Sequence, residues 1–133
     1  MFVLHERLAA DTVTITDWPL CRIQLMNDAT YPWVVLVPRR SGVVEIHELD
    51  AGDRLTLIEE IAKASHLLQN SVKAHKMNVA ALGNVVPQLH VHVVARFTTD
   101  PAWPKPVWGV VPPQPFEPHA LEQEVARLKQ LFS

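Results

Sequence analysis

The stretch Gln88-Leu89-His90-Val91-His92-Val93-Val94 alternates polar and apolar residues. Successive side chains of an extended strand point to opposite faces, so Gln88, His90 and His92 are predicted to line one face while the residues between them enter a core. Neighbouring members of this polar row lie about 7 Å apart along such a strand. Two imidazoles and an amide in one row indicate chemistry on an anionic group or a metal ion.

Three interpretations of the pair His90 and His92 remain open from this pattern alone. Neutral imidazole is a nucleophile near neutral pH, so one ring could attack a phosphorus atom while its neighbour stabilises the departing oxygens. The pair could instead bind Zn²⁺, although zinc usually takes three or four protein ligands and no third ligand stands at an obvious spacing. In the third interpretation, both rings lie on a solvated strand face and bind nothing.

Composition limits the class of protein. The chain has 133 residues, of which 48% are hydrophobic and 20% charged, which predicts one soluble domain with a single core. The net charge of -2 and the absence of Lys/Arg blocks argue against nucleic-acid and membrane partners. Cys21 is the only cysteine, so a reducing compartment is the simplest setting. With no signal peptide and no apolar run near the ~20 residues that span a bilayer, we expect a cytoplasmic protein.

Five strands are predicted from β-branched and apolar alternation, and from a nearly continuous apolar run after Pro32. They span residues 12–16, 21–26, 33–37, 77–82 and 89–97. Asp17-Trp18-Pro19-Leu20 carries turn chemistry and joins the first two strands as a hairpin. Residues 1–11 fit either a short helix or an extended arm.

The remaining segments are predicted to be helical or extended. Apolar residues recur at helical spacing after Asp50, a plausible N-cap, so a long helix runs from there to between Ser71 and His75. Prolines and tryptophans between residues 98 and 118 predict an extended segment laid on a surface, and residues 119–132 form a last amphipathic helix. This order of strands and helices predicts a single α+β domain over residues 1–133, with an antiparallel five-stranded sheet, one long helix and a C-terminal helix.

Other polar residues are candidates for binding a ligand. Gly83-Asn84 could present backbone N–H groups and an amide to a phosphate, and Asn27, at a strand end, could bind ribose hydroxyls. From the residues alone, ordinary turn chemistry is the favoured interpretation of both stretches. Arg96 shares the face of His90 by alternation and is therefore a candidate phosphate ligand.

Together these stretches resemble the histidine triad superfamily of nucleotide hydrolases and transferases, whose hallmark is His-x-His-x-His followed by two apolar residues. Here Gln88 takes the first position. Leu36-Val37-Pro38-Arg39-Arg40, the helix after Glu48-Leu49, and Gly83-Asn84 ahead of the motif also match the family. The likeness covers about residues 20–97, and the Trp-Pro tail resembles the family's C-terminal segment.

The resemblance implies a role for each residue of the motif. His90, in the middle position, would be the nucleophile, and His92 would contact the scissile phosphate and assist the leaving group. Compared with the histidine that the family has in the first position, Gln88 can still form hydrogen bonds in the catalytic row but cannot gain or lose a proton near neutral pH. Trp33 stands where many members have a further histidine, and it could change how a base or leaving group is packed.

The resemblance also implies the binding residues and the reaction. Asn27 would bind ribose, Asn84 would take the place of the usual Gln that touches phosphate or ribose, and Asn78 would match a further polar residue of the family. The expected activity is cleavage of a phosphoanhydride or phosphoramidate in a nucleoside phosphate or a dinucleoside polyphosphate-like molecule, without a metal or other cofactor. The expected assembly is a homodimer. The alternative is a nucleotide-binding module whose catalysis is weakened by three departures from the family pattern, at Gln88, Trp33 and Val85.

Overall fold

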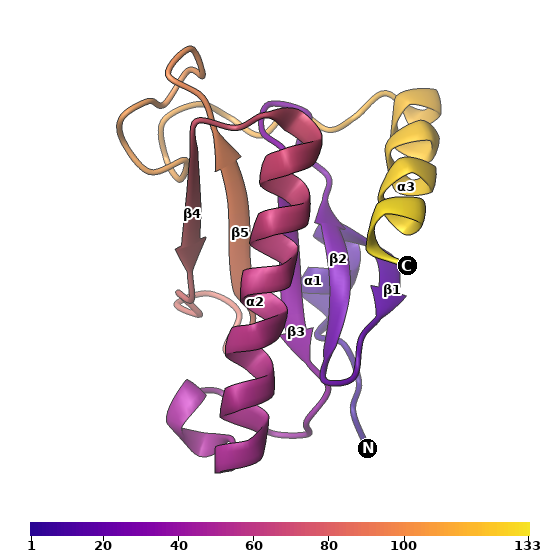
Figure 1. Cartoon of the computed structure of the whole chain (residues 1–133), viewed down its shortest axis with the longest axis vertical. Helices are drawn as coiled ribbons and strands as arrows, with labels where there is room; N and C mark the ends of the chain where they lie inside the picture. Colours follow the sequence, from indigo (N-terminus) through magenta and orange to yellow (C-terminus); the bar gives the residue numbers. More distant parts are fainter.

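The computed structural model describes residues 1–133 and shows a five-stranded antiparallel sheet in the order β1-β2-β3-β5-β4 (Figure 1). The strands are β1 (Thr12–Asp17), β2 (Cys21–Met26), β3 (Trp33–Pro38), β4 (Lys76–Ala80) and β5 (Val91–Arg96). The predicted α+β fold with five antiparallel strands is therefore confirmed. The last two strands are shorter than predicted, because β4 ends at Ala80, which pairs with His92, and the residues before Val91 have no β4 partner.

Both predicted helices are present, and the structure adds a short helix near the N-terminus and a 3-10 turn ahead of the long helix. The helical elements are α1 (Glu6–Asp11), the 3-10 turn η1 (Ile46–Glu48), α2 (Ala51–Val72) and α3 (Pro118–Phe132). Asp50 caps α2 as predicted, because its carboxylate accepts a hydrogen bond from the backbone N–H of Asp53. The first eleven residues, left open by the sequence, contain the short helix α1. None of these helices is both long and apolar enough to cross a membrane.

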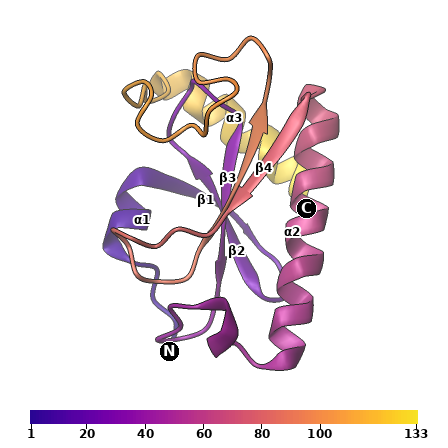
Figure 2. The same ribbon diagram turned by 90° about the vertical axis from the view of Figure 1, so that its left-hand side faces the viewer.

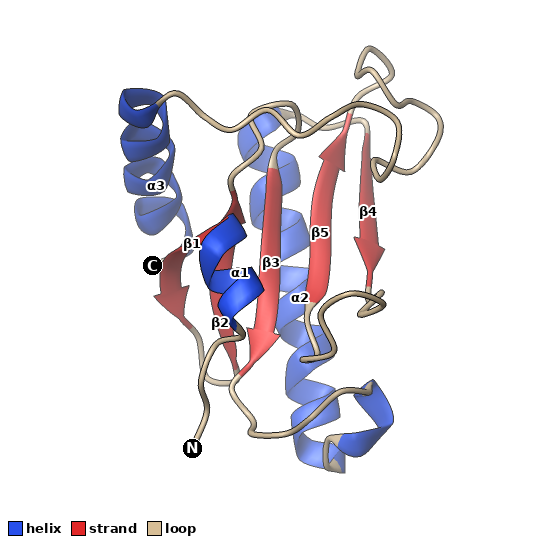
Figure 3. Ribbon diagram, turned by 180° about the vertical axis from the view of Figure 1, so that it is seen from behind, coloured by secondary structure: helices blue, strands red, loops and turns tan.

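Helices cover both faces of the sheet. In the view of Figure 2, α2 lies on one side of the strands and α1 on the other. The face under α2 holds the larger hydrophobic core, to which β5 contributes Val91, Val93 and Ala95 and the residues just before it contribute Leu89. The face under α1 holds a smaller core, in which Leu8 of α1 meets Trp33, Val35 and Val94. The polar residues of the motif belong to this second face, which the C-terminal segment also crosses (Figure 3).

The two edges of the sheet differ. At the β1 edge, α3 packs its buried Leu128 and Phe132 against the sheet, and Phe132 stacks on Trp18 with ring centroids 5.4 Å apart. At the opposite edge, β4 pairs only with β5. Val79 of β4 is exposed there. An edge strand carries unpaired backbone groups, so β4 is available for pairing with another chain.

Candidate active site

The motif alternates in the structure as predicted. Leu89, Val91 and Val93 enter the core beneath α2, whereas His90 and His92 turn to the opposite face. Both imidazoles are buried, at 6% exposure, and their ring centroids lie 5.0 Å apart in an edge-to-face arrangement. The start of β5 and the residue just before it thus hold two rings side by side.

The hydrogen bond of His90 identifies which ring nitrogen carries its proton. His90 Nδ1 lies 2.7 Å from the backbone carbonyl oxygen of Gln88. A carbonyl oxygen only accepts, so Nδ1 must donate, and in the neutral ring Nε2 then carries a lone pair. His90 therefore offers Nε2 as a nucleophile.

His92 adopts the opposite tautomer. The indole Nε1–H of Trp33 donates to His92 Nδ1 at 3.0 Å. Indole nitrogen only donates, so Nδ1 of His92 is unprotonated and the single proton of the neutral ring sits on Nε2. Burial, together with the charge that His90 carries when protonated, lowers the pKa of His92 to about 4. Near neutral pH, His92 is therefore a neutral Nε2–H donor next to the lone pair of His90.

Both rings line a pocket of about 340 Å³. Its lining comes from the motif, from α1, from the loop that follows β4 and from Trp108 of the C-terminal segment. The other lining residues are Arg7, Leu8, Asp11, Met26, Leu82, Gly83, Asn84, Val85 and Val86. The pocket combines apolar walls with a few polar groups near two imidazoles, as ligand sites commonly do.

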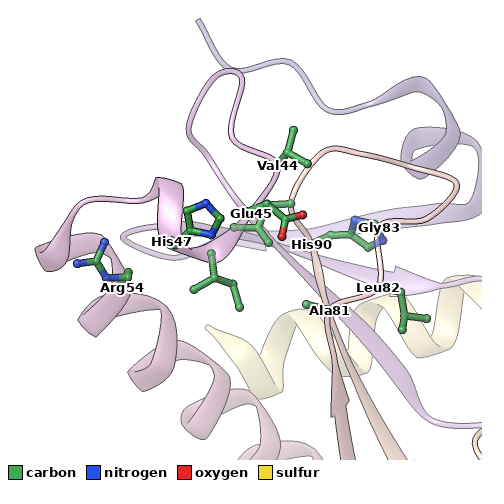
Figure 4. Close-up of a pocket in the computed structure, with 10 residues that line it drawn as sticks. Val44, Glu45, His47, Arg54, Ala81, Leu82, Gly83 and His90 are labelled. Carbon is green, nitrogen blue, oxygen red and sulfur yellow. The ribbon is translucent and has the colours of Figure 1, made fainter.

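A second hollow of about 350 Å³ also borders His90 (Figure 4). Its lining comes from the segment around η1, from Arg54 at the start of α2 and from Ala81 to Gly83 after β4. His92 and Trp108 do not line it. The pocket that contains both histidines is therefore the candidate active site.

Asn84 is the one predicted binding residue that the structure places in this pocket with the two histidines. It follows Gly83, whose φ of +71° lies in the left-handed region that favours glycine. The turn at Gly83 redirects the chain after β4 so that Asn84 to Val86 form a wall opposite α1. The prediction that Asn84 contacts phosphate or ribose remains a proposal consistent with this position.

Gln88 is used differently from the sequence-based expectation. Its side-chain oxygen accepts from the backbone N–H of His5 at 2.8 Å, and its Nε2 donates to the carbonyl oxygen of Val3 at 2.9 Å. Both ends of the amide thus bind the N-terminal segment ahead of α1. In the structure the Gln88 side chain holds the segment that leads into α1, and its carbonyl oxygen orients His90. The place of Gln88 in the catalytic row stays a prediction.

Arg96 and Asn78 do not line the pocket of the two histidines, and both have partners within the protein, so their ligand-binding roles stay predictions. Arg96 is 1% exposed and pairs with Asp100 through Nε and Nη2 at 2.8 and 3.0 Å. Its Nη1 donates to Asn78 Oδ1 and its Nη2 also donates to the carbonyl oxygen of Lys105. The guanidinium therefore anchors the segment after β5 and has no free face for a phosphate.

Asn27 also has a structural partner. Its side-chain oxygen accepts from the backbone N–H of Phe116 at 2.9 Å, and Asp28 accepts from the backbone N–H groups of Thr30 and Gln114. These bonds tie the C-terminal segment to the β2–β3 loop. Asn27 does not line the pocket of the two histidines. The contact of Asn27 with ribose therefore stays a prediction.

Three pocket residues escaped the sequence analysis. Arg7 and Asp11 of α1 form an ion pair at 2.9 Å on the pocket wall. Trp108 lies edge-on to His92, with ring centroids 5.1 Å apart, and to Trp33, at 5.7 Å. The prolines and tryptophans predicted a segment docked on the surface, but they did not indicate which tryptophan lies next to the two histidines. Leu4 and Leu8 with the adjacent alanines left a helix or an extended arm open here, and the i,i+4 spacing of Arg7 and Asp11 is a further helix signal that the sequence offered.

No three His, Cys, Asp or Glu side chains gather to form a possible metal site. The structure therefore places no third ligand beside His90 and His92 for a zinc ion.

Residues 7–99 match the sequence profile of the HIT domain. The chain belongs to the HIT, or histidine triad, family. None of the proteins with curated descriptions that were compared matches the chain.

Solved HIT structures resemble the chain over nearly its full length. A histidine triad protein from Marinobacter aquaeolei VT8 is 50% identical with a TM-score of 0.95, covering 98% of this chain and 96% of that one. A histidine triad protein from Bradyrhizobium japonicum is 46% identical with a TM-score of 0.93, covering 97% and 96% of the two chains. A third, from Sinorhizobium meliloti 1021, is 41% identical with a TM-score of 0.93, covering 98% and 96%. HIT family membership supports a nucleotide-binding function.

The low pKa of His92 predicts an acid-sensitive fold in this HIT protein. The unfolded chain takes up the His92 proton near pH 6.5 but the folded chain only near pH 4, so the free energy of unfolding falls as the pH drops through this window. The shift corresponds to a loss of about 3 kcal/mol by pH 4. Urea unfolding of the wild type and of His92→Gln at pH 7, 5.5 and 4.5 measures it. The variant should show a flatter profile, and parallel profiles would contradict the assignment.

Proposed function

We propose that the protein is a nucleotide hydrolase or nucleotidyl transferase that works through a nucleotidyl-His90 intermediate. The observation that carries this proposal is the complementary pair of tautomers in one pocket: a lone pair on His90 Nε2 beside an N–H on His92 Nε2. The first group can attack phosphorus and the second can donate a hydrogen bond to a phosphoryl oxygen. HIT family membership supports the nucleotide as the ligand.

The proposed first step forms one bond and breaks one. The lone pair of His90 Nε2 attacks the phosphorus next to the ribose, a P–N bond forms, and the leaving group departs with the electron pair of its bond to phosphorus. The substituted ring keeps its Nδ1 proton and becomes positively charged. The Gln88 carbonyl oxygen, 2.7 Å from Nδ1, faces that charge and stabilises it.

The proposed second step regenerates the enzyme. A water oxygen, or the hydroxyl of an acceptor in a transfer reaction, attacks the same phosphorus. The P–N bond breaks, its electron pair returns to His90 Nε2, and the attacking oxygen loses a proton to solvent. The nucleophile is a side chain, so we propose that the reaction needs no metal or cofactor.

The nucleoside part of the substrate is proposed to lie between α1 and the loop after β4. Leu8, Met26 and Val86 supply apolar contacts for a base, whereas Asn84 and Arg7 supply donors for phosphate or ribose oxygens. The volume of about 340 Å³ is at the lower end for a small-molecule site, which favours one nucleoside monophosphate unit inside and the rest of the substrate outside.

The test separates an enzyme from a binding module. Diadenosine tetraphosphate and an adenosine 5′-phosphoramidate are incubated with the protein, and release of AMP is followed by chromatography. Binding of AMP is measured in parallel by calorimetry. The proposal predicts both binding and turnover. Tight binding of AMP without turnover of either probe would instead establish a catalytically weakened nucleotide-binding module.

We also propose that two chains form a homodimer through β4 and the adjoining side of α2. Exposed apolar side chains occur on both elements, at Val79 and Ile58. Ile58 stands one helical turn from Arg54, which lines a hollow with the residues after β4, so it lies on the β4 side of α2. Pairing of two β4 edges would join the sheets and cover these residues.

Light scattering of the purified protein is expected to give the mass of two chains. The double variant Ile58→Glu and Val79→Glu should give the mass of one chain, because it places charges in the proposed interface without touching the core. Leu55→Glu is the control, since Leu55 is also an exposed apolar residue of α2 but lies on the side that faces Trp18 and Pro19. A wild-type mass of one chain would contradict the dimer.

A further inference from the structure

The hydrogen bond between Trp33 and His92 restricts what His92 can do in catalysis. Trp33 Nε1 is a donor only, and it lies 3.0 Å from His92 Nδ1. A second proton on the His92 ring would have to sit on Nδ1, where it would meet the indole N–H. The imidazolium form of His92 is therefore incompatible with this hydrogen bond.

Trp33 has little freedom to move away from His92. It is 7% exposed, begins β3, and packs edge-on against Tyr31 and Trp108, with ring centroids 6.3 and 5.7 Å away. Displacing the indole would open a cavity in the smaller core. The constraint on His92 thus comes from packing as well as from one hydrogen bond.

Nothing else around His92 favours its charged form. The titratable group nearest to it is His90, whose protonated ring would repel a charged His92. From α1, Arg7 and Asp11 line the same pocket but are paired with each other. The other neighbours carry no charge: Val35 of β3, Ala80 of β4 and Trp108 of the C-terminal segment.

We propose that Trp33 is a positioning residue that keeps His92 a neutral Nε2–H donor, and that the site is thereby selective for nucleoside phosphoanhydrides over phosphoramidates of alkylamines. This inference rests on the proposed function and narrows its substrate class. His92 then stabilises phosphoryl oxygens by hydrogen bonding but does not transfer a proton to the leaving group.

The selectivity follows from the leaving groups. When a phosphoanhydride is cleaved, the P–O bond breaks and its electron pair stays on an oxygen of a phosphate, which is a stable anion without a proton. When an alkyl phosphoramidate is cleaved, the P–N bond breaks and the amine nitrogen needs a proton as it leaves. Imidazolium is an effective donor of that proton, whereas neutral imidazole is a very weak acid.

The first test observes the tautomer directly and needs no substrate. Histidine labelled with ¹⁵N is incorporated, and two-bond ¹H–¹⁵N correlation spectra are recorded between pH 7.5 and 5.5, with His92 assigned by its loss in His92→Gln. We expect Nδ1 of His92 to be unprotonated and Nε2 protonated over the whole range. In Trp33→Phe, which keeps an aromatic ring but lacks the N–H, the tautomer preference should be lost. The pKa of His92 should then lie above its wild-type value, although burial and His90 still hold it below the ordinary value.

A matched control separates the hydrogen bond from aromatic packing. Trp108 also lies edge-on to His92 but makes no hydrogen bond to it. Trp108→Phe is therefore expected to keep the wild-type tautomer. A wild-type His92 with its proton on Nδ1, or one that titrates alike in the wild type and Trp33→Phe, would overturn the positioning role.

The second test measures selectivity. General acid catalysis contributes about 10²–10⁴-fold, so the wild type should favour diadenosine tetraphosphate over an adenosine 5′-alkylphosphoramidate by about 100-fold in kcat/KM. Trp33→Phe should lower this ratio by about tenfold at pH 5.5, because the N–H that excludes a second proton from His92 Nδ1 is gone and a larger fraction of His92 is protonated than in the wild type. Equal turnover of both probes by the wild type would overturn the selectivity. A locked tautomer with no turnover of either probe would uphold the positioning role and overturn the proposed function instead.

Discussion

Replacing His90 with alanine is expected to lower the turnover of diadenosine tetraphosphate by on the order of 10⁴-fold or more. The variant lacks the Nε2 lone pair that attacks phosphorus, and no other side chain in the pocket supplies a nucleophile at the same place. AMP binding should change much less, because the contacts proposed for the nucleoside come from α1 and from the loop after β4. Initial rates and calorimetric binding of the same preparation measure both quantities.

The matched control is His66→Ala. His66 lies on α2, where its ring contacts Asn70 on the exposed side of the helix, away from the pocket. Its replacement should leave turnover within a factor of two of the wild type. If His90→Ala kept more than about one tenth of wild-type turnover, His90 would not be the nucleophile.

The largest effect on stability is expected for Arg96→Leu, which should lower the free energy of unfolding by about 3–5 kcal/mol. The substitution leaves Asp100 buried without its cationic partner. Burial raises the pKa of Asp100, and the Arg96 guanidinium, with backbone N–H groups, lowers it below its usual range, so removing Arg96 leaves a carboxylate that is costly to keep ionised. Urea unfolding at pH 7 measures the change.

An exposed ion pair provides the comparison for Arg96. Arg127 binds Glu124 at 2.7 Å on the outside of α3, where water screens the charges. Arg127→Leu should cost no more than about 1 kcal/mol. A loss of the same size in both variants would show that the buried Arg96–Asp100 pair does not hold the segment after β5 in place.

Local patterns were sufficient to predict the fold. The alternation along residues 12–26 and the helical spacing after Asp50 depend only on neighbouring residues, and both elements occur where they were expected. The boundaries of β4 and β5 were less predictable, because a strand ends where its partner ends. Ala80 pairs with His92, and that register is not visible in either segment alone.

The candidate site was predictable only in part, for the same physical reason. The shared face of His90 and His92 follows from strand periodicity within three residues. The partners that redirect Gln88 and Arg96 come from elsewhere: Val3 and His5 are more than 80 residues from Gln88, and Asn78 belongs to a neighbouring strand. Such contacts depend on how the elements pack. Trp33 was identified as a departure from the family pattern, but its hydrogen bond to His92 required the structure.

The central claim is that catalysis passes through a nucleotide bonded to His90. The most direct measurement is the mass of the protein quenched in alkali within milliseconds of mixing with excess diadenosine tetraphosphate, since a phosphorus–nitrogen bond to histidine is labile in acid. We predict a fraction of the protein heavier by one adenylyl group, located on the peptide that contains His90 and absent from His90→Ala. Turnover with no such adduct at any quench time, or an adduct that persists in His90→Ala, would contradict the account.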